Sequence, residues 1–246
     1  MTPSGSIDLP EDEVHVWYAS LGQAAQLHAR LLALLSPDEG ERARRFYFEV
    51  DRLRSVAVRG TLRILLGRYL DLQPEEIRFT YGQFGKPALG EAAGARWLHF
   101  NVSHSEDLAV FAFARSQPVG VDAERIRSIT DESRFAAQLF SPAESAILNS
   151  LSGYERVHAF FRLWTAKEAF LKAAGLGLTI PLDRIEIALA EDGSPRLVAI
   201  EGQAEQARTW RLQAFNPLPD YEISLAIESA GCRILCFPVP EDIYNR

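Results

Sequence analysis

The sequence repeats itself in order, and this internal repetition constrains the possible folds more than any other feature. Four pairs of segments match along the chain: residues 14–16 with 119–121, residues 36–39 with 141–144, residues 85–89 with 193–197, and the apolar runs that begin at Leu108 and Ile223. The first two pairs are offset by 105 residues, the third by 108 and the last by 115. Short insertions in the second copy produce such rising offsets, whereas chance matches would scatter. We therefore expect two related halves, residues 1–117 and residues 118–246.

Each half is expected to begin with a strand, pass through helices and end in several strands. Ser36 and Ser141 are each followed by a proline and, three residues later, by a glutamate, which is typical of a capping box at a helix N-terminus. Apolar residues at helical spacing predict main helices at roughly 51–70 and 154–174. Helices followed by runs of strands favour an α+β fold with mainly antiparallel sheets. Two similar halves would be related by pseudo-two-fold symmetry, with a ligand cleft between them.

Composition and charge exclude several classes of protein. The longest unbroken apolar run, residues 108–114, has seven residues, and a membrane-spanning helix needs about 20. A formal net charge of −7 argues against nucleic-acid binding, which requires a basic face. The two cysteines form neither a disulfide framework nor a zinc site, and the first residues lack a targeting pattern, so we expect a cytoplasmic protein. Arginines clustered within residues 42–54 can still hold an anionic ligand.

The second half carries two acids that the first half lacks. At the offset of 105 residues, Asp122 and Glu124 stand where the first half has Trp17 and Ala19. The two acids are two residues apart in a strand pattern, so their side chains share one face. They repel each other unless a cation lies between them, and oxygen ligands favour Mg²⁺. The alternative is an exposed strand edge with solvated acids.

The predicted second main helix carries a further charged pair. At the same offset, Glu168 replaces Arg63 and Lys172 replaces Gly67. An i, i+4 pair of this kind is often an ordinary surface ion pair, but Trp164 lies on the same stripe, which favours the lining of a cleft. Taken alone, Lys86 before Pro87 indicates a turn, and His104 indicates a structural histidine.

The joint pattern resembles a known enzyme family. Val119-Gly120-Val121-Asp122-x-Glu124, followed about 40 residues later by Trp164-Thr165-Ala166-Lys167-Glu168-Ala169-x-x-Lys172, is similar to the paired signature of the 4′-phosphopantetheinyl transferases. The similarity is to the Sfp type, in which one chain contains both copies. Arg44-Arg45-Phe46-Tyr47, Phe84-Gly85-Lys86-Pro87 and Phe100-Asn101-Val102-Ser103-His104-Ser105 extend the resemblance from about Ser36 to Leu182.

The resemblance implies transfer of the 4′-phosphopantetheine arm of coenzyme A to a serine of an apo acyl or peptidyl carrier protein, which releases adenosine 3′,5′-bisphosphate. It implies that Mg²⁺ is held by Asp122, Glu124 and Glu168. The expected contacts with coenzyme A come from both halves: Arg42 and Arg54 at its 3′-phosphate end, Lys86 and Pro87 at the adenine, Ser103 and His104 at its phosphates, and Lys172 at the pyrophosphate. Glu39 departs from the family, because relatives often have a basic residue at this position.

The chemistry assigns roles that the sequence leaves partly open. Lys172 and a protonated His104 would stabilise charge on the leaving phosphate. The base that takes the serine proton is either Glu168 or Glu144 acting through a water molecule. The duplication favours a monomer, since it already supplies a two-fold interface. The alternatives are a Mg²⁺-dependent nucleotide pyrophosphatase and a non-catalytic module that binds coenzyme A or a carrier protein. The sequence does not identify the carrier.

Overall fold

The chain divides into two compact units in the computed structural model. The structure describes residues 6–22, 27–82, 85–90, 95–128, 138–177, 179–229 and 231–244. Unit 1 comprises Met1–His99, His104–Ser116 and Arg233–Arg246, and unit 2 comprises Phe100–Ser103 and Gln117–Cys232. The expected boundary at residues 117 and 118 therefore lies beside a change of unit, but two short segments cross it.

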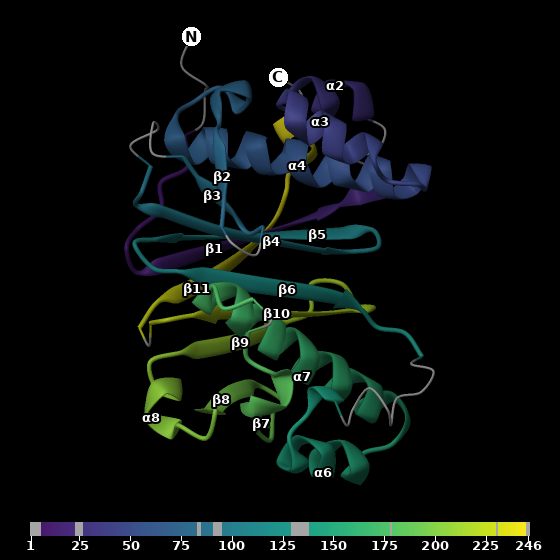
Figure 1. Cartoon of the computed structure of the whole chain (residues 1–246), viewed down its shortest axis with the longest axis vertical. Helices are drawn as coiled ribbons and strands as arrows, with labels where there is room; N and C mark the ends of the chain where they lie inside the picture. Colours follow the sequence, from purple (N-terminus) through teal and green to yellow (C-terminus); the bar gives the residue numbers. More distant parts are fainter. Residues whose placement is uncertain are drawn as a thin grey trace. The chain divides into compact units, whose positions relative to one another are not determined.

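Unit 1 combines helices with a four-stranded sheet of order β11-β1-β5-β4 (Figure 1). Its elements are β1 (Glu13–Ser20), α2 (His28–Ala33), α3 (Pro37–Arg44), α4 (Glu49–Leu70), η1 (Pro74–Glu76), β2 (Phe79–Tyr81), β3 (Pro87–Leu89), β4 (Leu98–Ser105), β5 (Leu108–Arg115), β11 (Arg233–Pro238) and η4 (Glu241–Tyr244). The middle of β4, Phe100–Ser103, is counted with unit 2. Strand β1 is antiparallel to β5 and parallel to β11. The last strand of the chain thus completes the sheet of unit 1.

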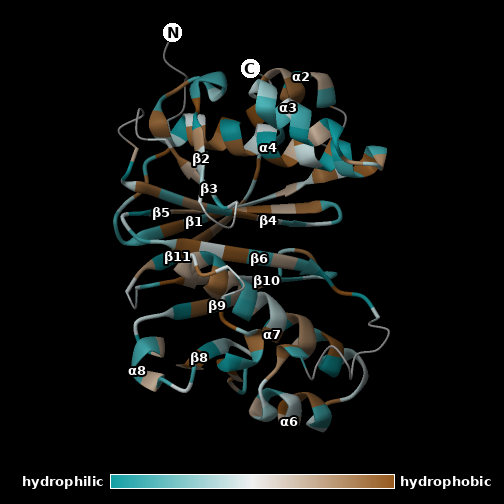
Figure 2. Cartoon of the chain, viewed as in Figure 1, coloured by the Kyte–Doolittle hydropathy of each residue, from teal (hydrophilic) through white to brown (hydrophobic). Residues whose placement is uncertain are grey.

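Unit 2 packs a long helix on a three-stranded antiparallel sheet of order β6-β10-β9. Its elements are β6 (Val119–Arg125), α6 (Pro142–Ser150), α7 (Gly153–Ala174), η3 (Leu182–Arg184), β7 (Ile185–Leu189), β8 (Pro195–Ile200), α8 (Ala204–Ala207), β9 (Arg211–Phe215) and β10 (Tyr221–Ile227). Helix α7 lies against β6 and β10. Figure 2 shows hydrophobic and polar residues alternating along α7, as expected of a helix with one buried side. Phe160, Leu163 and Phe170 belong to its buried core.

The strand pairing confirms the repeat and the α+β class. The hairpin β2–β3 pairs Phe79 with Leu89, and the hairpin β7–β8 makes the same pair 108 residues later, Ile187 with Leu197. The last repeated strand is shifted from its predicted offset. Val14 pairs with Ala114 and Val119 pairs with Ile227, so β5 and β10 are 113 residues apart, not 115. The ladder fixes this equivalence, whereas the start of an apolar run does not.

Both predicted capping boxes are present. The backbone N–H of Ser36 donates to Glu39 at 2.9 Å, and that of Ser141 donates to Glu144 at 2.7 Å. Both glutamates are buried, and each forms an ion pair with a cation from the long helix that follows. The cation is Arg63 in unit 1.

The equivalent cation in unit 2 corrects one sequence assignment. Lys167 binds Glu144 as Arg63 binds Glu39, so Lys167, not Glu168, occupies the place of Arg63. Helices α4 and α7 both have 22 residues and begin 104 residues apart. Glu168 therefore matches Ile64, because one residue is lost between the capping box and the helix. Lys172 matches Arg68 for the same reason, not Gly67.

None of the helices in the described ranges is both long enough and apolar enough to cross a membrane.

Candidate active site

A glycine brings α7 against the strand that carries the two predicted metal ligands. A Cβ atom built on Gly120 would lie 2.0 Å from the carbonyl oxygen of Ala169 and 2.4 Å from the backbone nitrogen of Ala173. Real Cβ atoms essentially never approach backbone so closely, so no larger residue fits this position. The C-terminal half of α7 is thereby held over β6.

Lys172 is the centre of the polar cluster that this packing creates. Its ammonium group donates to Asp122 Oδ1 at 2.6 Å, to Ser103 Oγ at 3.1 Å and to the carbonyl of Val121 at 3.3 Å. Ser103 in turn donates to Asp122 Oδ1 at 2.9 Å. The structure therefore joins three residues that the sequence assigned to coenzyme A and Mg²⁺ from three separate motifs.

The neighbouring carboxylates change the titration of Glu168. Burial raises the pKa of its carboxyl above the ordinary value, and the charge of Asp122 raises it further. Lys172 opposes these effects, and Glu124 adds a smaller increase to the same pKa. Asp122, Glu124, Glu168 and Lys172 thus form one electrostatic group on β6 and α7.

One carboxylate oxygen, Asp122 Oδ2, supports the binding of a divalent ion by this group. Among the residues that the structure describes, no three His, Cys, Asp or Glu side chains stand in a ready-made metal site. Asp122 Oδ1 is occupied by Lys172 and Ser103, but Asp122 Oδ2 is buried and has no hydrogen-bond donor. A buried carboxylate oxygen without a donor costs free energy unless a cation or water satisfies it. The donor set, all carboxylate oxygen, fits a hard cation such as Mg²⁺.

Glu144, the other candidate base, is enclosed in the protein. Its side chain is fully buried and accepts hydrogen bonds from Lys167 at 2.6 Å, Ser141 at 2.7 Å and the backbone N–H of Ile187 at 2.7 Å. Burial lowers the pKa of Lys167, and the Glu144 charge opposes that shift. These contacts tie α6, α7 and β7 together, so the structural role of Glu144 is clear.

The predicted arginines of unit 1 are paired with surface acids. Arg42 binds Asp38 at 2.6 Å and donates to the Tyr81 hydroxyl at 2.8 Å, with its guanidinium 4.3 Å from the centre of that ring. Arg54 binds Asp107 at 2.9 Å. Ion pairs near the surface contribute little to stability.

The remaining predicted contacts of unit 1 lie on its strands and turns. Lys86 precedes Pro87, the first residue of β3, and His104 lies in β4. Burial lowers the pKa of His99, and the charge of Lys86 lowers it further. Phe84, from the same motif as Lys86, lies outside the described residues.

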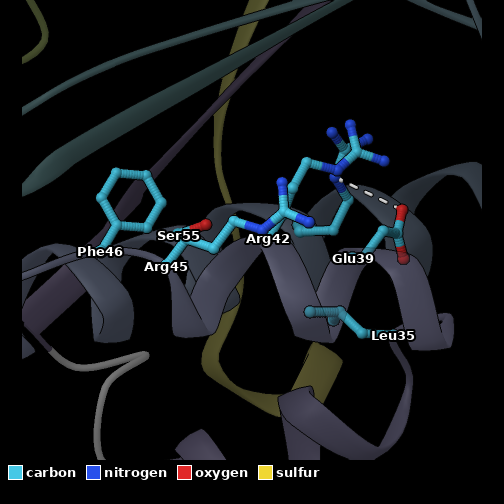
Figure 3. A pocket seen from close by; sticks show the side chains of 7 residues that line it. Leu35, Glu39, Arg42, Arg45, Phe46 and Ser55 are labelled. Atoms are coloured by element: carbon cyan, nitrogen blue, oxygen red, sulfur yellow. Dashed lines mark ion pairs between the residues drawn. The ribbon is translucent and has the colours of Figure 1, made fainter.

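Two arginines of the cluster predicted within residues 42–54 line a basic cavity of unit 1 (Figure 3). It encloses about 370 Å³ and is lined by Leu35, Glu39, Arg42, Arg45, Phe46, Ser55 and Arg59. Figure 3 shows Arg42, Arg45 and Glu39 directed around this space. Arg59 lies 3.5 Å from Glu39, and its Nη1 atom is buried without a hydrogen-bond partner. The sequence analysis singled out neither Ser55 nor Arg59 for this role.

Comparison with known proteins identifies the class. Residues 118–226 match the family model described as the 4'-phosphopantetheinyl transferase superfamily, and residues 22–116 match 4'-phosphopantetheinyl transferase, N-terminal. The 4'-phosphopantetheinyl transferase HetI of Nostoc sp. is 39% identical over 92% of this chain and 91% of its own length. The 4'-phosphopantetheinyl transferase Sfp of Bacillus subtilis is 35% identical over 67% of this chain and 70% of its own length.

Among solved structures, a holo-(acyl-carrier-protein) synthase from Bacillus anthracis in complex with CoA (3',5'-ADP) is similar to part of the chain. The likeness covers 46% of this chain and 96% of that one, with a TM-score of 0.38 and 20% identity.

The chain belongs to the 4′-phosphopantetheinyl transferase family, and its relatives support the Sfp type. It is an enzyme that transfers 4′-phosphopantetheine to carrier proteins. The family inferred from the paired motifs is thereby confirmed.

Proposed function

We propose that the chain moves the 4′-phosphopantetheine arm of coenzyme A to a serine hydroxyl of an apo acyl or peptidyl carrier protein, depends on Mg²⁺, and releases adenosine 3′,5′-bisphosphate. One observation carries this proposal. Lys172, Ser103 and Asp122 share a hydrogen-bonded cluster beside the carboxyl of Glu168, whose pKa burial and Asp122 raise. A cation and a hydroxyl donor next to clustered acids suit a pyrophosphate and its metal ion.

Asp122, Glu124 and Glu168 are the residues that would hold Mg²⁺. The unpartnered Asp122 Oδ2 and the mutual repulsion of the acids support this assignment. When bound, Mg²⁺ would neutralise negative charge on the pyrophosphate and so lower the barrier to phosphoryl transfer.

Lys172 and Ser103 are proposed to bind the pyrophosphate directly. The ammonium group of Lys172 donates to Asp122 at 2.6 Å, and phosphate oxygens would compete for the same donors. The positive charge of Lys172 would then lie where the leaving phosphate becomes more negative. His104, which follows Ser103 in β4, is proposed to add a second donor to the phosphates of coenzyme A.

The basic cavity of unit 1 is proposed to take the phosphorylated nucleotide end of coenzyme A. Three arginines line it, Arg42, Arg45 and Arg59, against one carboxylate, Glu39. Glu39 is also bound by the buried Arg63 at 2.8 Å, so the departure at position 39 leaves the cavity positive. Arg54, Lys86 and Pro87 are the further contacts that the family motifs propose for this end.

Glu168 is the better-supported base for the carrier serine. Its carboxyl belongs to the same electrostatic group as Asp122 and Lys172, beside the proposed pyrophosphate site. Glu144 is fully enclosed, and each of its oxygens already accepts a hydrogen bond from the protein.

The deciding experiment incubates the full chain with coenzyme A, Mg²⁺ and a panel of apo carrier proteins from fatty-acid, polyketide and peptide synthesis. We expect one or more carriers to gain the mass of a single phosphopantetheine group, on the serine and only with a divalent ion. Adenosine 3′,5′-bisphosphate formed without a modified carrier would indicate a pyrophosphatase instead. Coenzyme A binding without any product would indicate a binding module.

A monomer in the cytoplasm is part of the same proposal. The internal repeat supports a monomer, since one chain already contains both copies of the fold. Light scattering coupled to gel filtration would test it, and the mass of two chains would contradict it.

A further inference from the structure

A fourth carboxylate, Glu222, lies on the face that carries the proposed metal ligands. In the β6–β10 ladder, Glu222 is directly opposite Glu124, and Ser224 is directly opposite Asp122. Opposite residues in an antiparallel ladder project to the same face, with Cβ atoms about 5 Å apart. No sequence motif predicts this role for Glu222, because it is brought close to Glu124 only by strand pairing.

The carboxylate of Glu222 contacts two residues of α7. Arg162 forms a bidentate ion pair with Glu222, in which Nη2 donates to Oε1 at 2.9 Å and Nε donates to Oε2 at 3.1 Å. His158 Nδ1 lies 2.9 Å from Oε1. Glu222 is fully buried, so a fork of this kind is needed to keep an ionised carboxylate there.

The position of Arg162 is itself fixed by a turn. Its Nη1 atom donates to the carbonyl of Gly193 at 3.2 Å, in the turn between β7 and β8. Gly193 has a φ of +79°, and a Cβ atom there would lie 2.4 Å from Arg162 Nη1. The glycine therefore leaves the space that the guanidinium occupies. Three elements, β10, α7 and the β7–β8 turn, hold the network in place.

We propose that Arg162, supported by His158, is a positioning residue that sets the charge of the metal-binding face. By neutralising Glu222, it leaves only Asp122, Glu124 and Glu168 to attract the cation, and it keeps Glu222 from acting as a competing ligand. The proposal rests on the proposed role of these three acids in holding Mg²⁺. It gives Glu222 and Arg162 equal and opposite effects on the same ion.

The direction in which two substitutions change the affinity for a metal ion tests this arrangement. R162Q removes a positive charge and frees Glu222, so the full chain should bind Mn²⁺, a spectroscopic substitute for Mg²⁺, several-fold to tenfold more tightly. Transfer should nevertheless fall, since the extra ligand draws the ion from its productive position. E222Q leaves the Arg162 charge unbalanced, so Mn²⁺ affinity should fall by a similar factor. The double variant R162Q/E222Q should return near the wild-type affinity.

The measurement is a titration of the full chain with Mn²⁺ alone, followed by electron paramagnetic resonance, with circular dichroism to show that each variant is folded. R162K, which keeps the charge but not the fork, is the second variant if R162Q does not fold, and it should leave Mn²⁺ affinity closer to wild type. A purely structural network would weaken binding in both single variants or change neither. Either result overturns the proposal.

The two proposals fail differently. If wild-type chain binds no Mn²⁺, the metal site and the positioning role are both wrong. If wild-type chain binds Mn²⁺ but the single variants shift in the same direction, the metal site stands and the role of Arg162 is wrong.

Discussion

The same pair of elements, a strand and a long helix, is packed differently in the two units. In unit 2, Gly120 lets the backbone of α7 lie against β6, with polar groups of Asp122 and Lys172 meeting at the end of the contact. In unit 1, the positions equivalent to Gly120 and Asp122 are His15 and Trp17. Trp17 Nε1 donates a hydrogen bond to the Tyr69 hydroxyl of α4 at 2.8 Å, and His15 Nδ1 forms a hydrogen bond with the same hydroxyl at 2.8 Å. Side chains therefore connect α4 to β1, whereas the backbone of α7 lies directly against β6.

The two copies of the repeat therefore fill the space between strand and helix with different groups. Large aromatic side chains fill the space between helix and strand in unit 1, where burial raises the pKa of Tyr69 and so keeps its hydroxyl protonated. In unit 2 the backbone of α7 packs directly on Gly120 of β6, and Asp122 and Lys172 lie beside this contact. Both copies retain the buried pair between the capping-box glutamate and the helix cation.

The largest effect is expected from breaking the buried pair in unit 2. Lys167→Met leaves Glu144 buried without its cation, which should lower the free energy of unfolding by about 3–5 kcal/mol. Arg63→Met is the matched change in unit 1. Arg63→Met should lower the free energy of unfolding less, because Arg59 lies 3.5 Å from Glu39 and still balances its charge. Urea denaturation of both variants measures the difference, and an equal or larger loss for Arg63→Met would contradict this comparison.

Gly120→Ala should separate α7 from β6. The added methyl group meets the backbone of Ala169, which cannot move like a flexible side chain, so we expect a loss of roughly 1–3 kcal/mol or more. Gly40→Ala in α3 is the control, since the nearest atom to its Cβ is the end of Arg44 at 3.8 Å. That change should be neutral or slightly stabilising. A thermal melt in which both variants match the wild type would refute the close packing.

Asp122→Asn should abolish most transfer while the fold survives. The amide keeps the size and one oxygen of the side chain but removes the charge that the cation needs. Loss of a direct ligand should exceed the 10–100-fold cost typical of groups that only support a ligand. Turnover at saturating Mg²⁺ measures this effect. A variant with near-normal turnover and an unchanged Mg²⁺ requirement would remove Asp122 from the metal site.

Lys172→Ala should lower turnover by about 10–100-fold and raise the KM for coenzyme A less. The reason is that its charge matters most when the leaving phosphate becomes more negative. Steady-state rates with an apo carrier separate the two constants. Unchanged turnover with weaker binding alone would reject the proposed role and leave Lys172 as a partner of Asp122.

The smallest effect is expected in the basic cavity of unit 1. Arg59→Gln should raise the KM for coenzyme A a few-fold but leave the KM for 3′-dephospho-coenzyme A nearly unchanged. Arg52→Gln is the control, because Arg52 lies on α4, pairs with Glu49 at 3.4 Å and is not among the cavity residues. If Arg59→Gln raised both KM values equally, the cavity would not be the binding site of the 3′-phosphate.

Local patterns predicted much of this molecule. Each capping box is encoded within four residues, and the Gly-x-Pro turns marked both hairpins at the right offset. The family signature singled out Asp122 and Lys172, which the structure joins in an ion pair at 2.6 Å. These features depend on short stretches of sequence, whose physical preferences act without the rest of the chain.

The errors and omissions depend on contacts between distant residues. A one-residue difference between the capping box and the long helix is not evident until Lys167 is seen to bind Glu144, so the sequence matched Glu168 with Arg63. Glu222 approaches Glu124 only through strand pairing, and Arg59 enters the cavity only through the packing of α4 on α3. Neither arrangement has a local signal.

Strand β11 has a consequence for the order in which the molecule can be completed. Arg233–Pro238 pairs in parallel with β1, near the opposite end of the sequence. A ribosome therefore releases every residue of unit 2 before it releases the edge strand of unit 1, so the first-made half is the last to be finished. Until then β1 presents an open edge, which other chains could pair with. Shortening the chain from residue 233 onward would thus remove an edge strand from unit 1 and leave the strands of unit 2 intact.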